Sequence, residues 1–180
     1  YGSNNIIYSG HAEIPVYNIL RPPKCDVERR VNNIALLILA ETITDCAACR
    51  DIEFLEVQTL PIEDDANLYT YGYGYMNQPC YRGNKKSTVL RKTGMTVLSD
   101  HKCSRLTENA SKKGRLICTR PNNFISTVCS GDEGAPLVDQ TMKRIVGVMN
   151  FGDDYCANGA PVVYTSVAPY AMWISKNIAY

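Results

Sequence analysis

The sequence predicts an all-β protein, built as one compact domain or as two small barrels that share an interface. Its 180 residues fit that size. Short apolar runs recur between Gly, Pro, Asn and Asp residues, at the spacing of about 8–12 residues that is typical of sandwiches and barrels. Many of the runs carry β-branched or aromatic residues, which pack well on a pleated surface.

The expected strands follow these apolar runs along the chain. Examples are Ile14–Ile19, Ile34–Leu39, Leu68–Tyr75, Ser87–Arg91, Arg115–Cys118, Arg144–Phe151 and Val162–Val167. Each run is short enough for a strand and is bounded by turn-forming residues.

Helix signals occur in two places. Ser99 and Asp100 can cap a short helix that runs toward Leu106. Ala168 and Pro169 precede an apolar set at helical spacing. That set is Tyr170, Trp173, Ile174 and Ile178. We therefore expect the C-terminus to dock as one amphipathic helix.

An acidic stretch separates two strand-rich halves of the chain. It begins at Leu60-Pro61 and contains three consecutive acidic residues, 63–65, before Ala66. We expect residues 1–62 to belong to an N-terminal unit and residues 63–180 to form a C-terminal unit with the closing helix.

Charge and hydropathy exclude two classes of partner. The 19 Lys and Arg residues against 18 Asp and Glu residues leave a net charge of +1, too little for the basic surface that nucleic acid requires. The longest apolar run, Ile34–Ala40, has seven residues, whereas a helix that crosses a bilayer needs about 20. We expect neither nucleic acid nor a membrane as a partner.

The cysteines predict an oxidising environment. Eight cysteines are spread over the chain, and Asn109-Ala110-Ser111 is an N-glycosylation sequon. Together they favour a secreted, extracellular glycoprotein with disulfide bonds, glycosylated at Asn109.

Residues 129–138 carry the strongest local motif. They read Cys-Ser-Gly-Asp-Glu-Gly-Ala-Pro-Leu-Val. This stretch resembles the nucleophile loop of the chymotrypsin and trypsin family of serine proteases, C-x-G-D-S-G-G-P. Glu133 stands where that family has its nucleophilic serine, and Ala135 replaces the second glycine of the pair.

Further motifs resemble the same family and occur in the family's order. Residues 31–37 are similar to its N-D-I-A-L-L strand, with Asn33 at the place of the triad aspartate. Residues 71–74 resemble S-G-W-G, residues 147–152 resemble G-I-V-S-W-G, and residues 160–165 resemble K-P-G-V-Y-T. The resemblance implies two packed antiparallel six-stranded β-barrels, with the first barrel incomplete in this chain, and a C-terminal α-helix.

The resemblance also implies two disulfides, Cys103 with Cys118 and Cys129 with Cys156. A third bridge of the family has lost both of its ends, which are Leu68 and Asp139 here. The pairing of the remaining cysteines stays open. These are Cys25, Cys46, Cys49 and Cys80.

Structural bridges are the preferred interpretation of those four cysteines. A redox role for the Cys46-Ala47-Ala48-Cys49 spacing would need a βαβ context that the chain lacks. Zinc binding by four thiolates is a weaker alternative, because their spacing is irregular. We expect no metal and no cofactor.

The start of the chain resembles a stretch that follows the histidine motif of the family. Residues 1–5 are similar to its L-G-E-x-N, so roughly 50 family residues would precede them. We therefore expect a second or leading chain that completes the first barrel.

The resemblance implies that the triad is degenerate. Neither His11 nor His101 matches the catalytic position, Asn33 carries no charge, and Glu133 is a weak nucleophile. The amides of the loop at Gly131, Asp132 and Glu133 could still bind an oxyanion. From these positions we expect that the protein is not an enzyme.

The resemblance also places the remnant of a substrate groove. Its residues are Thr127 at the pocket base, Val128, Asn150, Phe151, Gly152 and Val162. Val162 replaces a glycine and is expected to narrow the entrance. The expected function is protein binding, as a decoy, regulator or inhibitor of a proteolytic cascade that binds a regulated protease or a host protein. Inactivated relatives of this kind are known in arthropods, including parasitic mites.

Two alternatives remain open. One is an active serine-type endopeptidase with displaced catalytic residues, and the other is a structural or toxin subunit of a two-chain assembly.

Overall fold

The computed structural model of the chain describes residues 5, 7, 13–43, 52–76, 85–106, 114–123, 126–152, 156 and 159–178. Its strands are β1 (Val16–Leu20), β2 (Leu36–Leu39), β3 (Glu56–Val57), β4 (Asn67–Gly72), β5 (Arg91–Val97), β6 (Leu116–Pro121), β7 (Pro136–Asp139), β8 (Arg144–Phe151) and β9 (Val162–Ser166). Its helices are α1 (Asp100–Leu106), the 3₁₀ turn η2 (Ala168–Tyr170) and α2 (Ala171–Ile178).

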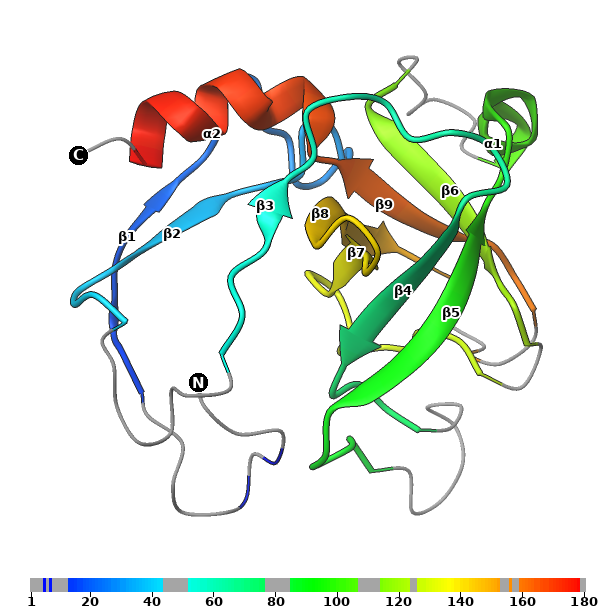
Figure 1. The fold of residues 1–180 in the computed structure, drawn as a ribbon, viewed down its shortest axis with the longest axis horizontal. Coiled ribbons are helices and arrows are strands. Elements are labelled where there is room, and N and C mark those ends of the chain that lie inside the picture. Colours follow the sequence, from blue (N-terminus) through cyan, green and yellow to red (C-terminus); the bar gives the residue numbers. More distant parts are fainter. Residues whose placement is uncertain are drawn as a thin grey trace.

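Six strands close into a barrel. Their order is β8-β7-β4-β5-β6-β9, and the antiparallel pairing of β8 with β9 joins the two ends (Figure 1). Each strand places alternate side chains inside, because successive residues of a strand point to opposite faces. The interior side chains include Leu68, Met95, Leu137, Val146 and Tyr164, all at most 1% exposed. This core fixes the positions of the loops at the barrel ends.

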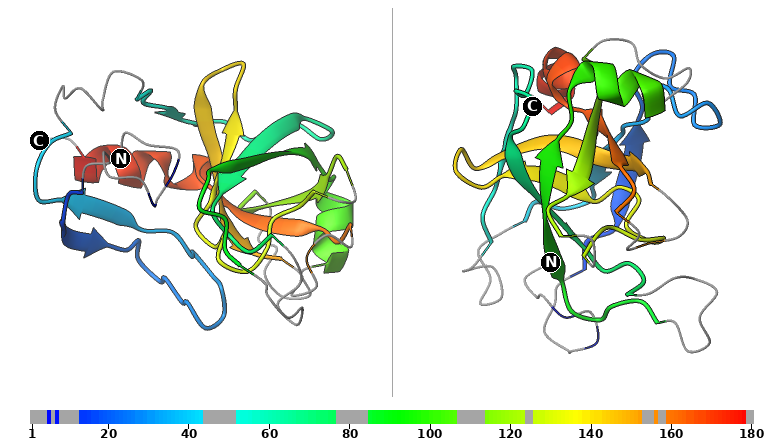
Figure 2. Two further views of the ribbon diagram at one scale, coloured as in Figure 1. Left: turned by 90° about the horizontal axis from the view of Figure 1, so that it is seen from below. Right: turned by 90° about the vertical axis from the view of Figure 1, so that its right-hand side faces the viewer.

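A second, two-stranded sheet lies beside the barrel. It pairs β1 with β2 antiparallel, and in Figure 1 it stands on the opposite side from β4 and β5, with α2 above it. The left view of Figure 2 shows the same separation from below. Leu36 of β2 packs against a buried cluster that includes Tyr170 and Ile174, so the C-terminal helix joins the sheet to the barrel.

The other face of this sheet is apolar and exposed. Tyr17 is 79% exposed, Ile19 51% and Leu37 58%. Ile19 and Leu37 are direct partners across the strand pair, so their side chains share one face. The described residues therefore leave a sheet face uncovered that has the composition of a core.

The predicted all-β fold class with a C-terminal helix is confirmed. The six-stranded barrel is closed, and β1 and β2 form a separate sheet beside it; that this sheet belongs to a first barrel stays a prediction. Both predicted helices are present. At the start of α1, the carbonyl oxygen of Ser99 accepts the backbone N–H of Cys103 at 2.9 Å. Within the described residues, no helix is long and apolar enough to cross a membrane.

Some predicted strand bounds differ from the structure. Ser87–Arg91 was expected as a strand, but the strand begins only at Arg91. The Ser87 hydroxyl donates to the Val89 carbonyl at 2.6 Å, and such local bonds compete with a sheet ladder. The strands β3 and β7 lie outside the expected runs. The two residues of β3 are too few to show a periodic pattern, and β7 overlaps the loop motif of residues 129–138.

Both predicted disulfides are present. Cys103 on α1 is joined to Cys118 on β6, and Cys129 to Cys156, with Cα–Cα distances of 5.3 and 5.1 Å. Cys25 is a free thiol, and Cys46, Cys49 and Cys80 lie outside the described residues.

The division of the chain near residue 62 stays a prediction. The parallel pair of β3 with β8 connects the segment before that point to the barrel.

Truncation of a barrel core side chain tests this packing. We expect Leu137→Ala to lower the free energy of unfolding by about 2–5 kcal/mol, because Leu137 is 0% exposed and its removal leaves a cavity. Urea denaturation measures the change. The control Met142→Ala, at a side chain that is 55% exposed, should shift stability by less than about 0.5 kcal/mol. Equal effects of the two substitutions would contradict the described core.

Candidate functional site

The loop between Cys129 and Ala135 is held by the carboxylate of Asp132. Its Oδ1 accepts the backbone N–H of Gly74 at 2.8 Å, and its Oδ2 accepts the backbone N–H of Cys129 at 3.0 Å. The backbone of the same residue closes two turns, since Asp132 N–H donates to Cys129 O and Ala135 N–H donates to Asp132 O. Bonds from N–H groups to an ionised carboxylate are stronger than bonds between neutral groups. Asp132 thus joins the loop to the chain after β4.

Two glycines make room for this carboxylate. A Cβ atom on Gly72 would lie 1.9 Å from Asp132 Oδ1, and one on Gly74 would lie 2.5 Å from Oδ2. A side chain at either position would force the Asp132 carboxylate to shift. The sequence Tyr-Gly-Tyr-Gly at residues 71–74 is therefore required by the position of Asp132.

The side chain of Glu133 turns back onto its own loop. Its Oε2 accepts the backbone N–H of Gly131 at 2.8 Å. Gly131 has φ of +91°, a conformation that side chains rarely adopt. The Gly131 amide, which is expected in an oxyanion loop, is thus bonded to a carboxylate of the same chain.

A polar network joins the segment before β2 to the barrel. Asn33 Nδ2 donates to Asn150 Oδ1 at 2.9 Å, and Asn150 Nδ2 donates to Thr165 Oγ1 at 3.2 Å. Thr165 Oγ1 in turn donates to the carbonyl of Asn33 at 2.9 Å. Asn150 and Thr165 are buried, at 6% and 1% exposure. Two amides and a hydroxyl satisfy one another here, so the network carries no charge.

An arginine covers the aromatic ring at the end of β8. The Arg30 guanidinium carbon lies 4.7 Å from the centre of the Phe151 ring, within the range of a cation–π contact. Asn150 Nδ2 also donates to the Arg30 carbonyl at 3.2 Å, so the network fixes this backbone. Arg30 adopts φ of +56°, which such support helps to maintain.

The comparisons with known proteins agree with this arrangement. A family model described as Trypsin matches residues 3–174. The chain belongs to the trypsin family. Trypsin 5G1 of Aedes aegypti is 29% identical over 169 residues, which are 93% of this chain and 61% of that protein. Serine protease SP24D of Anopheles gambiae is 30% identical over 147 residues, 82% of this chain and 49% of that protein.

A solved structure of the trypsin fold superposes on almost the whole chain. Neuropsin, a serine protease expressed in the limbic system of mouse brain, gives a TM-score of 0.84 at 21% identity and covers 99% of this chain and 77% of its own. This likeness shows the fold alone. The chain spans only 61% and 49% of the two mosquito relatives, so the activity of the whole protein is a matter of proposal.

One prediction from the sequence is corrected here. The residues Asn33 and Glu133, together with the lack of a histidine at the catalytic position, led to the expectation that the protein is not an enzyme. The comparisons contradict that expectation, because the matching family is Trypsin and the named relatives are a trypsin and serine proteases. The chain is a member of the trypsin family, and the names of its relatives point to a protease.

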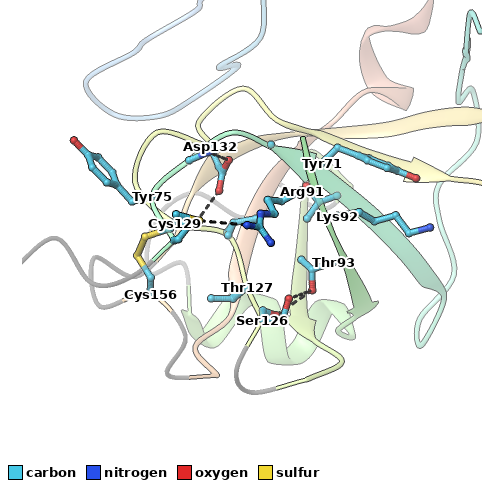
Figure 3. A pocket seen from close by; sticks show the side chains of 15 residues that line it. Tyr71, Tyr75, Arg91, Lys92, Thr93, Ser126, Thr127, Cys129, Asp132 and Cys156 are labelled. Carbon is cyan, nitrogen blue, oxygen red and sulfur yellow. Dashed lines mark hydrogen bonds between the residues drawn. A yellow bond between two sulfur atoms is a disulfide. The ribbon is translucent and has the colours of Figure 1, made fainter. Parts of the chain in front are cut away.

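A pocket of about 290 Å³ lies beside the Asp132 loop of this trypsin-family chain. Figure 3 shows it with Asp132 at one end and the bonded hydroxyls of Thr93 and Ser126 at the other, where Ser126 Oγ donates to Thr93 Oγ1 at 2.9 Å. Thr127 lines this pocket, as do Arg91 and Lys92. Its polar wall distinguishes it from the apolar barrel interior.

The structure brings together most of the predicted groove residues. A Cβ on Gly152 would lie 3.8 Å from Val128 and 3.9 Å from Val162. Val162 is 2% exposed and packs in the barrel core, so its side chain fills space beside Gly152.

Asn109 and His11 lie outside the described residues, and His101 is an exposed residue of α1.

Sequence reasoning missed two parts of the site. The partnership of Asn33 with Asn150 spans 117 positions and has no local signal. The cover of Phe151 by Arg30 was also missed. The two glycines at 72 and 74 did carry a signal, because glycine within or at the end of a strand often marks a close approach of other atoms.

Substitution of a site glycine tests the role of Asp132. Gly72→Ala should lower the free energy of unfolding by about 1–3 kcal/mol, because the new methyl group overlaps the carboxylate. Gly152→Ala is the matched control, since its Cβ would come no nearer than 3.6 Å to a neighbouring atom, which is an ordinary contact distance that needs no rearrangement. Thermal unfolding of both variants measures the difference. A neutral Gly72→Ala would contradict the position assigned to Asp132.

Proposed function

We propose that this trypsin-family chain acts by binding another protein, as a decoy, regulator or inhibitor in a proteolytic cascade. The observation that carries the proposal is the bond from Gly131 N–H to the Glu133 carboxylate. In this loop a negative group faces the amide that would otherwise receive a carbonyl oxygen. A loop with its amide already bonded favours recognition of a polypeptide in the groove.

The groove itself supports polypeptide binding. Phe151 ends β8 as a partly exposed aromatic ring, and the Arg30 guanidinium lies on it. Aromatic and arginine side chains contribute strongly to protein interfaces. An extended segment that lies along the end of β8 would contact both groups.

Peptide-bond hydrolysis is the second candidate function. The relatives favour it, since they are named trypsin and serine protease. It requires a nucleophile and a base supplied by groups other than Asn33 and Glu133, because acyl transfer in this family uses a hydroxyl and an imidazole. Labelling with a serine-directed phosphonate separates the two functions, since a covalent adduct would favour hydrolysis.

We also propose that a second or leading polypeptide completes the first sheet. The exposed apolar face of β1 and β2 supports this, because an isolated two-stranded sheet is marginally stable in water. We propose in addition that the protein is secreted and glycosylated at Asn109. The two disulfides support secretion, and the sequon supports glycosylation.

The mass of the natural protein tests the leading polypeptide. A loss of about 5–6 kDa on reduction, near 50 residues at the usual mass per residue, is expected if that polypeptide is disulfide-linked. Native mass spectrometry then detects one that is held without a covalent bond. A species of 20.0 kDa plus glycan under both conditions would contradict the proposed polypeptide.

Substitution of the groove aromatic tests polypeptide binding. Phe151→Ala should weaken the binding of a short, end-capped extended peptide about tenfold, or about 1.4 kcal/mol, through the lost ring contact. Fluorescence anisotropy measures the affinity, and mass spectrometry shows whether the peptide stays intact. The control is Met172→Ala on α2, at a residue that is 72% exposed. Equal affinities for both variants would refute binding at this ring.

A further inference from the structure

The carboxylate of Asp132 bears a charge that no ion pair compensates in the described part of the chain. Its two oxygens accept the backbone N–H groups of Gly74 and Cys129, which bring no net charge. Asp132 is only partly exposed, and a carboxylate that loses water is costly unless an opposite charge lies nearby. A carboxylate offers about four acceptor positions, so room for a cation remains.

The guanidinium of Arg91 also makes no ion pair with any described residue. Its Nε–H donates to Ser87 Oγ at 3.2 Å, and its Nη2 donates to the sulfur of Met76 at 3.4 Å. Both acceptors are neutral, and a thioether sulfur accepts weakly. A guanidinium has five N–H donors, so most of them remain available to a carboxylate.

The strand register turns Arg91 toward this carboxylate. Arg91 is the direct partner of Gly72 in the antiparallel pair of β4 and β5. Side chains of direct partners point to the same face, with their Cβ atoms about 4.5–5.5 Å apart. A Cβ on Gly72 would lie 1.9 Å from Asp132 Oδ1. The side chain of Arg91 therefore begins about one strand spacing from the carboxylate, and it is long enough to span that gap.

Arg91 and Asp132 line the same pocket of about 290 Å³, and Figure 3 shows both side chains. Lys92 borders this pocket as well, but its ammonium lies 4.3 Å from the centre of the Tyr69 ring. Lys86 is not among the lining residues. Its Nζ approaches the loop from the side of Gly131, where it would lie 3.5 Å from a Cβ. Arg91 is thus the cation best placed for the carboxylate.

We propose that Arg91 is the counter-ion of Asp132, and that its guanidinium moves from Ser87 and Met76 onto the carboxylate inside the pocket. Arg91 is a positioning residue, because it acts on the Gly131 amide through Asp132. A charge-assisted bond to a partly buried carboxylate is stronger than a bond between neutral groups. The cation that fixes the loop is supplied by this chain itself. The inference does not depend on which of the two candidate functions applies.

Amide hydrogen exchange of Gly74 and Cys129, followed by NMR, measures how firmly Asp132 is held. Arg91→Gln should lower the protection of both amides about tenfold at low salt, because the loop opens more often without the pair. Arg91→Lys keeps a cation and should retain most of the protection. The loss in Arg91→Gln should shrink as salt is added, because ions screen the pair.

Matched lysine variants and a double-mutant cycle separate this pair from other contacts. Lys92→Gln and Lys86→Gln each remove a neighbouring cation and should leave both amides protected. Met76→Leu removes the sulfur that accepts from Arg91, and it should not reduce protection either. In urea denaturation, Arg91→Gln should lower the unfolding equilibrium less in an Asp132→Asn background than in the unmodified protein, by about fivefold. Circular dichroism checks that each variant is folded.

Three outcomes would overturn the inference. The first is unchanged protection of the two amides in Arg91→Gln. The second is an equal effect of Arg91→Gln with and without the Asp132 charge, which would show that Arg91 acts through Ser87 or Met76. The third is a loss of protection in Lys86→Gln in place of Arg91→Gln, which would make Lys86 the counter-ion. Failure of the Phe151-dependent peptide to bind would overturn the proposed function and leave this ion pair standing.

Discussion

The geometry of the site depends on the carboxylate of Asp132. It receives N–H groups from Gly74 and Cys129, which are 55 positions apart in the sequence and are brought together by the closed barrel. The loop turns at Gly131, where φ is +91°, and the disulfide from Cys129 to Cys156 fixes its beginning. Because the loop is anchored on both sides, the Gly131 amide and the Glu133 side chain are presented in a defined position beside the pocket that Thr127 lines.

A second constraint joins the smaller sheet to the barrel. Asn33, Asn150 and Thr165 form a closed set of hydrogen bonds, and Asn150 extends it to the Arg30 carbonyl. Buried polar groups of this kind are costly unless each finds a partner, so the set fixes how the segment before β2 lies on β8 and β9. The same network holds Arg30 over Phe151. The groove is consequently shaped by residues that lie far from its own strand.

The sequence was sufficient for the fold and for much of the site. The loop at 129–138 and the other motifs placed the chain in a fold that the structure confirms, and both disulfide pairs followed from that register. Long-range partners were not accessible, because the contacts of Asn150 and Arg30 depend on the three-dimensional arrangement of the strands. The lack of the family's serine, aspartate and histidine at the matching positions also led to the prediction of a non-enzyme, which the trypsin-family comparisons contradict.

Amide hydrogen exchange, followed by NMR, tests the central role of Asp132 most directly. The account predicts that the amides of Gly74 and Cys129 exchange slowly, since both donate to this carboxylate. It further predicts that both lose protection together in Asp132→Ala, while the amide of Val97, which donates to Ala66 O at 3.0 Å, remains protected. Fast exchange of Gly74 and Cys129 in the unmodified protein, or their undiminished protection in the variant, would contradict the claim that this carboxylate holds the loop.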